Sequence, residues 1–191
     1  MKNILINIPD LSKEHGGVYQ YSIALLKVLA KGNLDYTFFI LCNDPDEDIL
    51  GIVKENSNFH LTDFQPPRYN RYEMVLLNGL NLISRKLRFK KRFLKNDLYD
   101  CIISEYDINI IHTPTQSLIK KQNVKSITTL HDVQELHFPE FFTSEQRAYR
   151  AVHYKKAIDG ADAVIVSYEH VKKDIEKYFN KPKDQIHTIL L

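Results

Sequence analysis

The chain has 191 residues, of which 43% are hydrophobic and 26% charged, and its formal net charge is +2. This length suits one domain with a full core, the composition is that of an ordinary soluble globular protein, and the near-neutral charge indicates neither nucleic acid nor membrane as a partner. Two widely spaced cysteines, Cys42 and Cys101, argue against a disulfide scaffold and a structural zinc site and fit a reducing cytosol. The apolar run at the N-terminus is too short for a signal peptide, and no stretch approaches the roughly 18 apolar residues of a transmembrane helix.

Short apolar runs bounded by proline, glycine or polar residues predict buried strands. In chain order these strands cover residues 4–8, 36–41, 59–61, 109–112, 127–130, 163–166 and 186–189. The spacing of apolar residues between the strands predicts helices. These helices cover residues 18–31, 46–55, 72–95 and 97–106, and two more begin near residues 143 and 168.

Local signals refine this assignment. Thr143 and Gln146 have the spacing of a capping box, Ser167 is expected to cap the last helix, and the segment around Pro139 is expected to be a loop. The buried stripe of the first helix is expected to consist of Val18, Tyr21, Leu25 and Val28.

Strands that alternate with helices imply crossover connections, and therefore a parallel sheet that is covered on both faces. The predicted fold class is α/β, with a Rossmann-like, doubly wound, mostly parallel sheet in one domain over residues 1–191. The sequence stops at Leu191, two residues after the last predicted strand, so we also expect a truncated piece of a longer protein.

Gly16 and Gly17 lie between the first predicted strand and the first predicted helix. Glycine lets the backbone approach a ligand closely, and a helix N-terminus favours an anion such as phosphate. The GxGxxG fingerprint of dinucleotide-binding proteins and the GK[ST] of a P-loop are both missing. Taken alone, the pair fits a phosphate site and a simple tight turn equally well.

His131 and Asp132 directly follow the predicted strand at residues 127–130, and His112 ends the strand before it. Open parallel sheets place ligand-binding groups at the carboxyl ends of their strands. Two histidines, an acid and a glycine turn at equivalent strand ends favour a binding site over a set of purely structural residues.

A metal site built from His131, Asp132, Glu135 and His137 is the weaker alternative, because no HExxH or other established ligand spacing is present. No GxSxG nucleophile elbow is present either, which argues against a serine hydrolase. We therefore expect no metal.

A dense basic run occupies residues 85–95, with aromatic and aliphatic residues interleaved. A basic amphipathic helix of this kind can lie on an anionic lipid surface, and Arg85, Lys86, Lys90 and Lys91 are the candidates for that contact. A solvated helix face explains the same pattern equally well. Nucleic-acid binding is not expected, because no recognisable nucleic-acid motif accompanies the charge.

Several motifs, in this order and spacing, resemble the N-terminal half of the glycosyltransferase family 4 enzymes, which have the two-domain GT-B fold. They are Gly16-Gly17-Val18 and the segments at residues 128–132 (TTLHD), 161–167 (ADAVIVS), 172–175 (KKDI) and 183–189 (KDQIHTI). The likeness covers both ends and most of residues 109–191, whereas residues 44–107 are not diagnostic.

The resemblance implies retaining transfer of a sugar from a nucleotide-sugar, as co-substrate and without another cofactor, to a glycan or lipid-linked acceptor. It also implies that a C-terminal domain holds most of the donor while the N-terminal domain shapes the acceptor side. Gly16 and Gly17 would then approach the donor diphosphate, and His131 would be the catalytic residue facing the reacting sugar. The crevice nearby would be lined by His112, Asp132 and Ser167.

The chain also departs from the family pattern. The pair of glutamates in the family's C-terminal domain has no counterpart, and Gly17 is not followed by the further glycine of many members. We therefore expect the fragment alone to be inactive. We also expect it to lie in the cytoplasm or against the inner face of the membrane. The alternatives are a GT-B-type nucleotide-sugar epimerase and a non-catalytic module that docks on a membrane through the basic helix.

Overall fold

The computed structural model describes residues 2–32, 34–62, 72–73, 75–76, 79–80, 83 and 97–190. The chain divides into two compact units, one formed by Met1–Thr62 with Ile108–Leu191 and the other by Asp63–Asp107. In the smaller unit, helix α4 (Leu98–Tyr106) confirms the helix predicted there, and its N-cap Asp97 accepts a hydrogen bond from the backbone N–H of Tyr99 at 2.9 Å. The helix predicted over residues 72–95 lies mostly outside the described residues.

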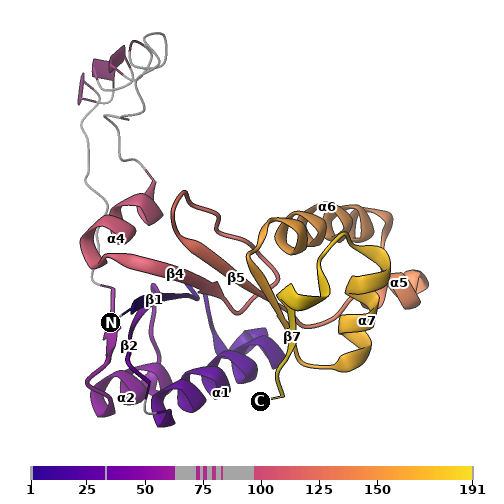
Figure 1. The fold of residues 1–191 in the computed structure, drawn as a ribbon, viewed down its shortest axis with the longest axis horizontal. Helices are drawn as coiled ribbons and strands as arrows, with labels where there is room; N and C mark the ends of the chain where they lie inside the picture. Colours follow the sequence, from indigo (N-terminus) through magenta and orange to yellow (C-terminus); the bar gives the residue numbers. More distant parts are fainter. Residues whose placement is uncertain are drawn as a thin grey trace. The chain divides into compact units, whose positions relative to one another are not determined.

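The larger unit is built on a seven-stranded sheet in which every strand is parallel to its neighbours (Figure 1). The strand order is β3-β2-β1-β4-β5-β6-β7. Every predicted strand is confirmed, each within two residues of its expected bounds. The strands are β1 (Lys2–Asn7), β2 (Tyr36–Leu41), β3 (Phe59–Leu61), β4 (Ile108–Thr113), β5 (Lys125–Leu130), β6 (Ala163–Val166) and β7 (Ile186–Thr188).

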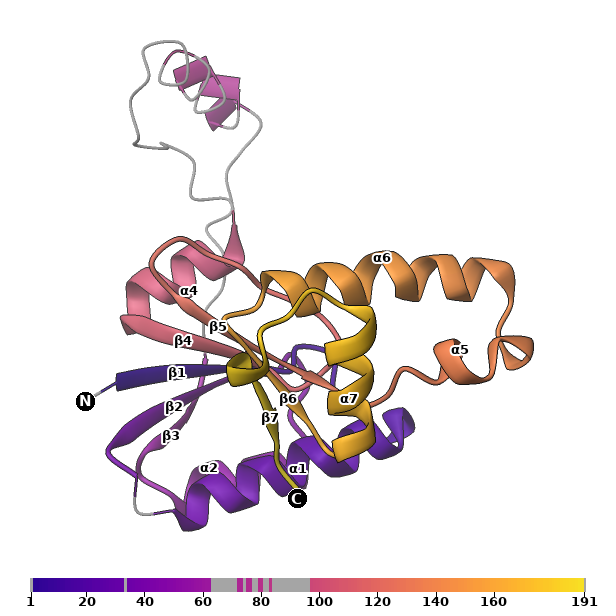
Figure 2. The same cartoon turned by 45° about the vertical axis from the view of Figure 1, so that its right-hand side comes forward.

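Helices cover both faces of this sheet (Figure 2). The four main ones are α1 (Gly17–Lys31), α2 (Glu47–Glu55), α6 (Ser144–Gly160) and α7 (Glu169–Tyr178). The first two pack on β1 to β3 in one apolar core, and the last two pack on β5 to β7 in another. The Rossmann-like, doubly wound fold is therefore confirmed. No helix in the described part of the chain is long and apolar enough to cross a membrane.

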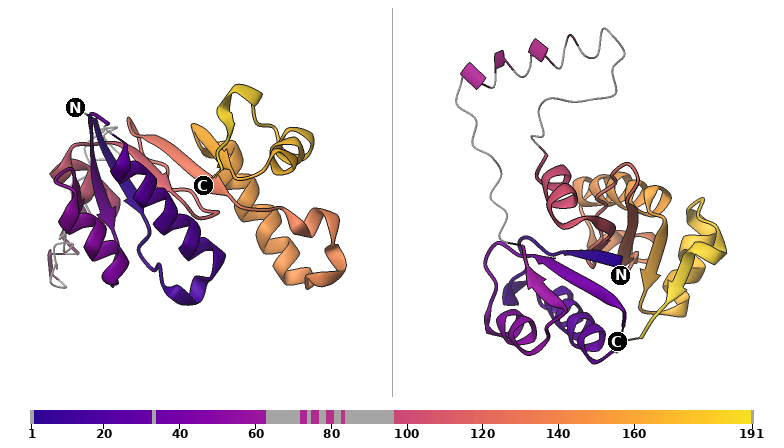
Figure 3. Two further views of the ribbon diagram at one scale, coloured as in Figure 1. Left: turned by 90° about the horizontal axis from the view of Figure 1, so that it is seen from below. Right: turned by 60° about the vertical axis from the view of Figure 1, so that its left-hand side comes forward.

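The connection from β5 to α6 is more ordered than expected. The predicted loop around Pro139 is wrong, because it contains a short helix α5 (Gln134–His137) and a 3-10 turn η2 (Pro139–Phe141), which lie beside the start of α6 (Figure 3). The capping box is confirmed: the hydroxyl of Thr143 accepts from the N–H of Gln146 at 3.2 Å, and the Gln146 side chain accepts from the N–H of Thr143 at 2.9 Å.

Two local predictions are wrong. Val28 was expected on the buried stripe of α1 but is 53% exposed, because the helix is rotated so that its buried face is centred on Ile23 and Leu26. The predicted cap of α7 is also wrong, since the N-cap is Tyr168 and Ser167 lies one residue earlier. The residues that α1 buries are Tyr19, Ser22, Ile23, Leu25 and Leu26.

The chain winds outward in opposite directions from the centre of the sheet. It passes from β1 to β2 and β3 on one side, and from β4 to β7 on the other. In a parallel sheet such a reversal leaves a crevice at the carboxyl ends of the two central strands, β1 and β4. The side-chain amide of Asn7 donates to the Thr113 hydroxyl at 3.3 Å there and ties the two strand ends together.

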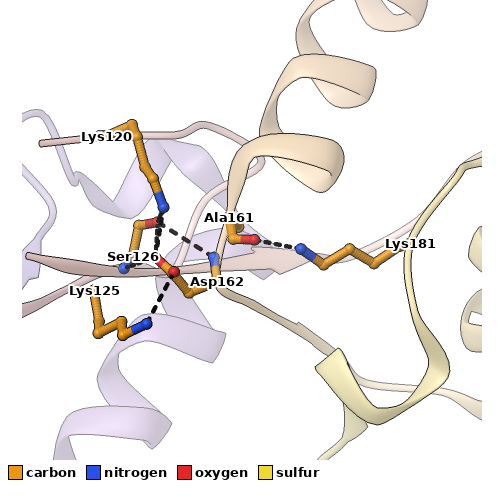
Figure 4. Close-up of polar contacts among 6 residues, drawn as sticks. All are labelled: Lys120, Lys125, Ser126, Ala161, Asp162 and Lys181. Carbon is orange, nitrogen blue, oxygen red and sulfur yellow. Dashed lines mark hydrogen bonds and ion pairs between the residues drawn. The ribbon is translucent and has the colours of Figure 1, made fainter. Parts of the chain in front are cut away.

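At the opposite, amino edge of the sheet, Asp162 joins β5 to β6 (Figure 4). One carboxylate oxygen accepts hydrogen bonds from Lys120 Nζ at 2.6 Å and from the N–H and hydroxyl of Ser126 at 2.8 and 2.9 Å. The other oxygen lies 3.4 Å from Lys125 Nζ. Burial would raise the pKa of Asp162, but the hydrogen bonds from Lys120 and Ser126 outweigh it and hold the pKa well below its usual range.

A buried lysine reinforces the same edge. Lys181, which follows α7, donates from its ammonium group to the carbonyl oxygen of Ala161, the residue before Asp162 (Figure 4). Burial lowers the pKa of this ammonium group, against the attraction of Asp162. The two contacts together fix the start of β6, and with it the direction in which β6 delivers its carboxyl end.

We predict that Asp162→Asn lowers the free energy of unfolding by about 1–3 kcal/mol at neutral pH, because Lys120 and Ser126 lose a charged hydrogen-bond acceptor. A carboxylate whose pKa is depressed in the folded state stabilises above its unfolded pKa. The difference from the wild type should therefore be full near pH 7 and shrink as the pH falls below about 3.9. Urea unfolding of both proteins, near pH 7 and again below about pH 3.9, measures this difference.

Asp159→Asn is the matched control, since Asp159 forms an ion pair with Lys155 one helical turn away on the surface of α6. Its expected effect is at most about 0.5 kcal/mol. Equal effects of the two substitutions would contradict the role given to Asp162.

Candidate functional site

The start of α1 faces the carboxyl ends of β5 and β6 across a pocket of about 580 Å³, which we call the α1-side pocket. Its walls come from the first two turns of α1, from the turn after β5 and from the residues after β6. Of the residues that the sequence analysis selected, Gly17, His131, Asp132 and Ser167 line this pocket. The fold thus brings four of them to one place.

Gly16 sets the backbone turn that opens the pocket. Its φ of 54° and ψ of −115° lie in a region that essentially only glycine adopts. This turn lets the 3-10 segment η1 (Lys13–His15) run into α1, whose first residue is Gly17. A Cβ at Gly17 would meet no atom within 4 Å, so the space in front of the first helical turn is open. The positive end of the α1 dipole therefore faces an accessible space.

His131 is held in one orientation by two neighbours. Its Nε2 lies 2.9 Å from the carbonyl oxygen of Pro114, and because a carbonyl oxygen only accepts, Nε2 carries the proton. The ring of Tyr21 meets it edge to face, with centroids 4.7 Å apart. Burial lowers the pKa of His131 and outweighs the Pro114 hydrogen bond and the charge of Asp132, which raise it. At neutral pH the ring is therefore neutral, with Nδ1 as its acceptor.

His112 is buried beneath the pocket rather than in its wall. It pairs in register with Ile6, a residue of the core under α1, and so points to the α1 face of the sheet. There its Nε2 lies 3.1 Å from the hydroxyl of Thr129, which lies 3.4 Å from the hydroxyl of Tyr21. Burial lowers the pKa of His112 to about 4, so the ring is neutral. His112 thus supports the tyrosine that packs against His131.

Asp132 is paired with a cation that the sequence analysis missed. Arg150 of α6 donates from Nη1 to Asp132 Oδ1 at 3.2 Å and to Glu135 Oε2 at 2.9 Å. The guanidinium also lies 4.6 Å from the centre of the Phe142 ring. One cation therefore neutralises the buried Glu135 and fixes the carboxylate of Asp132 on the pocket wall. No local spacing links residues 132 and 150, so only the folded chain reveals the pair.

A second pocket, of about 480 Å³, adjoins the first, and we call it the α7-side pocket. It is lined by α5, by Phe138 and by the first turns of α7. It shares His131, Asp132 and Tyr168 with the α1-side pocket. These three residues form a common wall between two chambers, of which only one lies against the N-terminus of α1.

The four residues weighed as metal ligands are used in other ways. Glu135 pairs with Arg150, and His137 Nε2 donates to Asp174 Oδ2 at 2.7 Å. Within residues 2–62 and 97–190, apart from residue 33, no three histidine, cysteine, aspartate or glutamate side chains converge as a metal site.

The membrane-surface candidates Arg85, Lys86, Lys90 and Lys91 lie outside the described residues.

A doubly wound parallel sheet with an open helix N-terminus at its central crevice places the chain in the Rossmann-like class of α/β proteins. Its sequence is more specific. The model of Glycosyltransferase Family 4 matches residues 15–190, so the chain belongs to this family. The match includes the last residue of η1, all of α1 and every residue that lines the two pockets.

Among solved structures, the chain is similar to the crystal structure of a glycosyltransferase from Rickettsia africae ESF-5. The two are 17% identical with a TM-score of 0.44, and the match covers 99% of this chain and 42% of that one. The chain thus spans less than half of that protein. The comparison with curated proteins found no match.

The two adjacent glycines should respond differently to alanine. We predict that Gly16→Ala lowers the free energy of unfolding by about 1–3 kcal/mol, because an L side chain is strained at its φ and ψ. Gly17→Ala should leave stability unchanged or slightly higher, since the position is helical, has ordinary φ and opens to empty space. Thermal and urea unfolding of both variants measure this difference. A Gly17→Ala effect as large as that of Gly16→Ala would contradict the turn described above.

Proposed function

We propose that the chain is the N-terminal, acceptor-side domain, residues 1–191, of a retaining glycosyltransferase. The enzyme would transfer a sugar from a nucleotide-sugar to a glycan or a lipid-linked acceptor. Family membership supports sugar transfer. One observation carries the residue roles: the N-terminus of α1 and the neutral ring of His131 face the same pocket.

The donor diphosphate fits the α1 end of this pocket. A helix N-terminus attracts negative charge, and the empty space at Gly17 allows phosphate oxygens to come close to the backbone. Gly16 contributes through the backbone turn that precedes the helix. A negative charge that grows on the departing diphosphate would be stabilised at the same place.

His131 is the residue that we assign to the reacting sugar. Its Nδ1 can accept a hydrogen bond from a sugar hydroxyl, while Pro114 and Tyr21 keep the ring from turning. A side chain that is already fixed loses little entropy when it orients a substrate. In the transfer, the bond from the anomeric carbon to the diphosphate oxygen breaks, the acceptor oxygen bonds to that carbon, and the diphosphate takes up the acceptor's proton.

Asp132 and Ser167 are assigned to the acceptor hydroxyls. The Asp132 carboxylate is held by Arg150 and borders both pockets, so it can accept a hydrogen bond at the point where the two meet. Ser167 borders the α1-side pocket at the end of β6 and can donate or accept.

The charges of the pocket support the need for a second domain. None of the described residues that line the α1-side pocket is a lysine or an arginine. One helix N-terminus is equivalent to about half a positive charge, which is too little for a diphosphate. We therefore propose that further cationic groups come from a C-terminal donor-binding domain, and that the 191-residue chain alone transfers no sugar.

We predict that His131→Ala lowers kcat on the order of 100-fold in a fusion of this chain with the C-terminal domain of a Family 4 enzyme. Release of labelled nucleotide and formation of labelled product from a panel of nucleotide-sugars measure it. The melting temperature should stay close to that of the parent fusion. His153→Ala is the matched control, because His153 is exposed on α6 and lines neither pocket.

Wild-type kcat in the His131→Ala fusion would contradict the catalytic role of His131. Robust turnover by the 191-residue chain alone would contradict the proposed need for a second domain. Epimerised nucleotide-sugar without transfer would identify the epimerase alternative.

A further inference from the structure

The α7-side pocket presents aromatic surfaces that the proposed roles leave unused. The Phe138 and Tyr168 side chains line it and remain about half exposed, at 52% and 54%. The ring of Tyr168 is stacked on that of His170, with centroids 5.4 Å apart and an angle of 22° between their planes. Flat rings at a pocket wall suit a ligand that has an apolar face of its own.

Polar groups stand between these rings. His137 donates to the largely buried carboxylate of Asp174, which links α5 to α7 across the pocket. Asp132, fixed by Arg150, provides a second carboxylate on the shared wall. Carboxylates held in place by other groups accept hydrogen bonds from hydroxyls in a fixed direction.

The charge of this pocket also limits its ligand. Two carboxylates line it, and none of the ten described lining residues is a lysine or an arginine. Arg150 carries one positive charge for both Asp132 and Glu135, so this group of three keeps a net negative charge, to which Asp174 adds. The first turn of α7 also lines the pocket, but a helix N-terminus contributes only about half a positive charge and does not offset these carboxylates. A phosphate or a uronate carboxylate would therefore meet like charge at the pocket wall.

A pyranose ring combines an apolar face of C–H groups with an edge of hydroxyls, and it matches aromatic rings and oriented carboxylates together. We propose that the α7-side pocket binds an uncharged sugar ring of the acceptor and rejects sugar phosphates and uronic acids. This rests on the proposed transferase function and assigns the acceptor subsite within it. The anionic donor lies on the α1 side of the His131–Asp132 wall, and the neutral acceptor lies on the α7 side.

The test uses the ¹⁵N-labelled 191-residue chain and NMR chemical-shift changes. The neutral probes are methyl β-D-glucopyranoside, methyl β-D-galactopyranoside and N-acetylglucosamine, and the anionic probes are glucose 6-phosphate and glucuronate. At least one neutral probe should shift the amide signals of residues 134–138 and 168–174. Each anionic probe should bind those residues at least about tenfold more weakly than its neutral counterpart.

A pair of phenylalanines provides the matched control. Phe138 lines the pocket, whereas Phe141, three residues later and 77% exposed, does not. Phe138→Ala should weaken the neutral probe at least about fivefold, while Phe141→Ala should leave its affinity unchanged. Asp174→Asn should weaken the neutral probe and reduce the discrimination against glucuronate.

Three results would overturn the proposal. They are no shift at these residues with any neutral probe, an equal or stronger affinity for the anionic probes, and equal effects of Phe138→Ala and Phe141→Ala. The transferase function is tested separately by the fusion enzyme. Transfer that depends on His131 but shows no sugar binding at the α7-side pocket would remove only the acceptor subsite, whereas sugar binding without transfer would remove only the transferase function.

Discussion

The parallel direction of all seven strands, together with the reversal of winding between β1 and β4, is the constraint on which the candidate site depends. Parallel strands send every carboxyl end to one edge of the sheet, and the reversal keeps the connections from covering that edge at its centre. Asp162 and Lys181 fix the start of β6 at the amino edge. Because strands are stiff, contacts at the amino edge help to set the position of the residues that follow β6 at the carboxyl edge.

His131 is the residue at this edge of the sheet to which we assign a chemical role. Its position between two pockets follows from its place after β5, but its state follows from burial and from the carbonyl of Pro114. His112 and Thr129 lie on the same face of the sheet and support Tyr21 from below. The result is a neutral, oriented ring on a wall that has an anion-attracting helix end on one side and an aromatic, carboxylate-lined chamber on the other.

The strands and the fold class could be predicted because short apolar runs between helical patterns admit few other arrangements. The glycine turn and the strand-end residues His131 and Asp132 could be found for the same reason, since parallel strands place such residues at one edge. The buried face of α1 could not, because Tyr19 is buried with its hydroxyl satisfied by Asp46 and Asp48, which apolar periodicity does not register.

Contacts between distant residues were equally hidden in the sequence. The pairing of Arg150 with Asp132 depends on how α6 returns across the sheet. The link between His137 and Asp174 depends on a short helix in the segment before Pro139, where the sequence predicted a loop. The account as a whole rests on a neutral His131 with its proton on Nε2. Long-range ¹H–¹⁵N NMR of the histidine rings, assigned with His131→Gln and followed between about pH 5 and pH 8, measures both properties. We predict the Nε2–H tautomer and a pKa below the ordinary value of 6.5. An Nδ1–H tautomer, or a pKa above 6.5, would contradict the account.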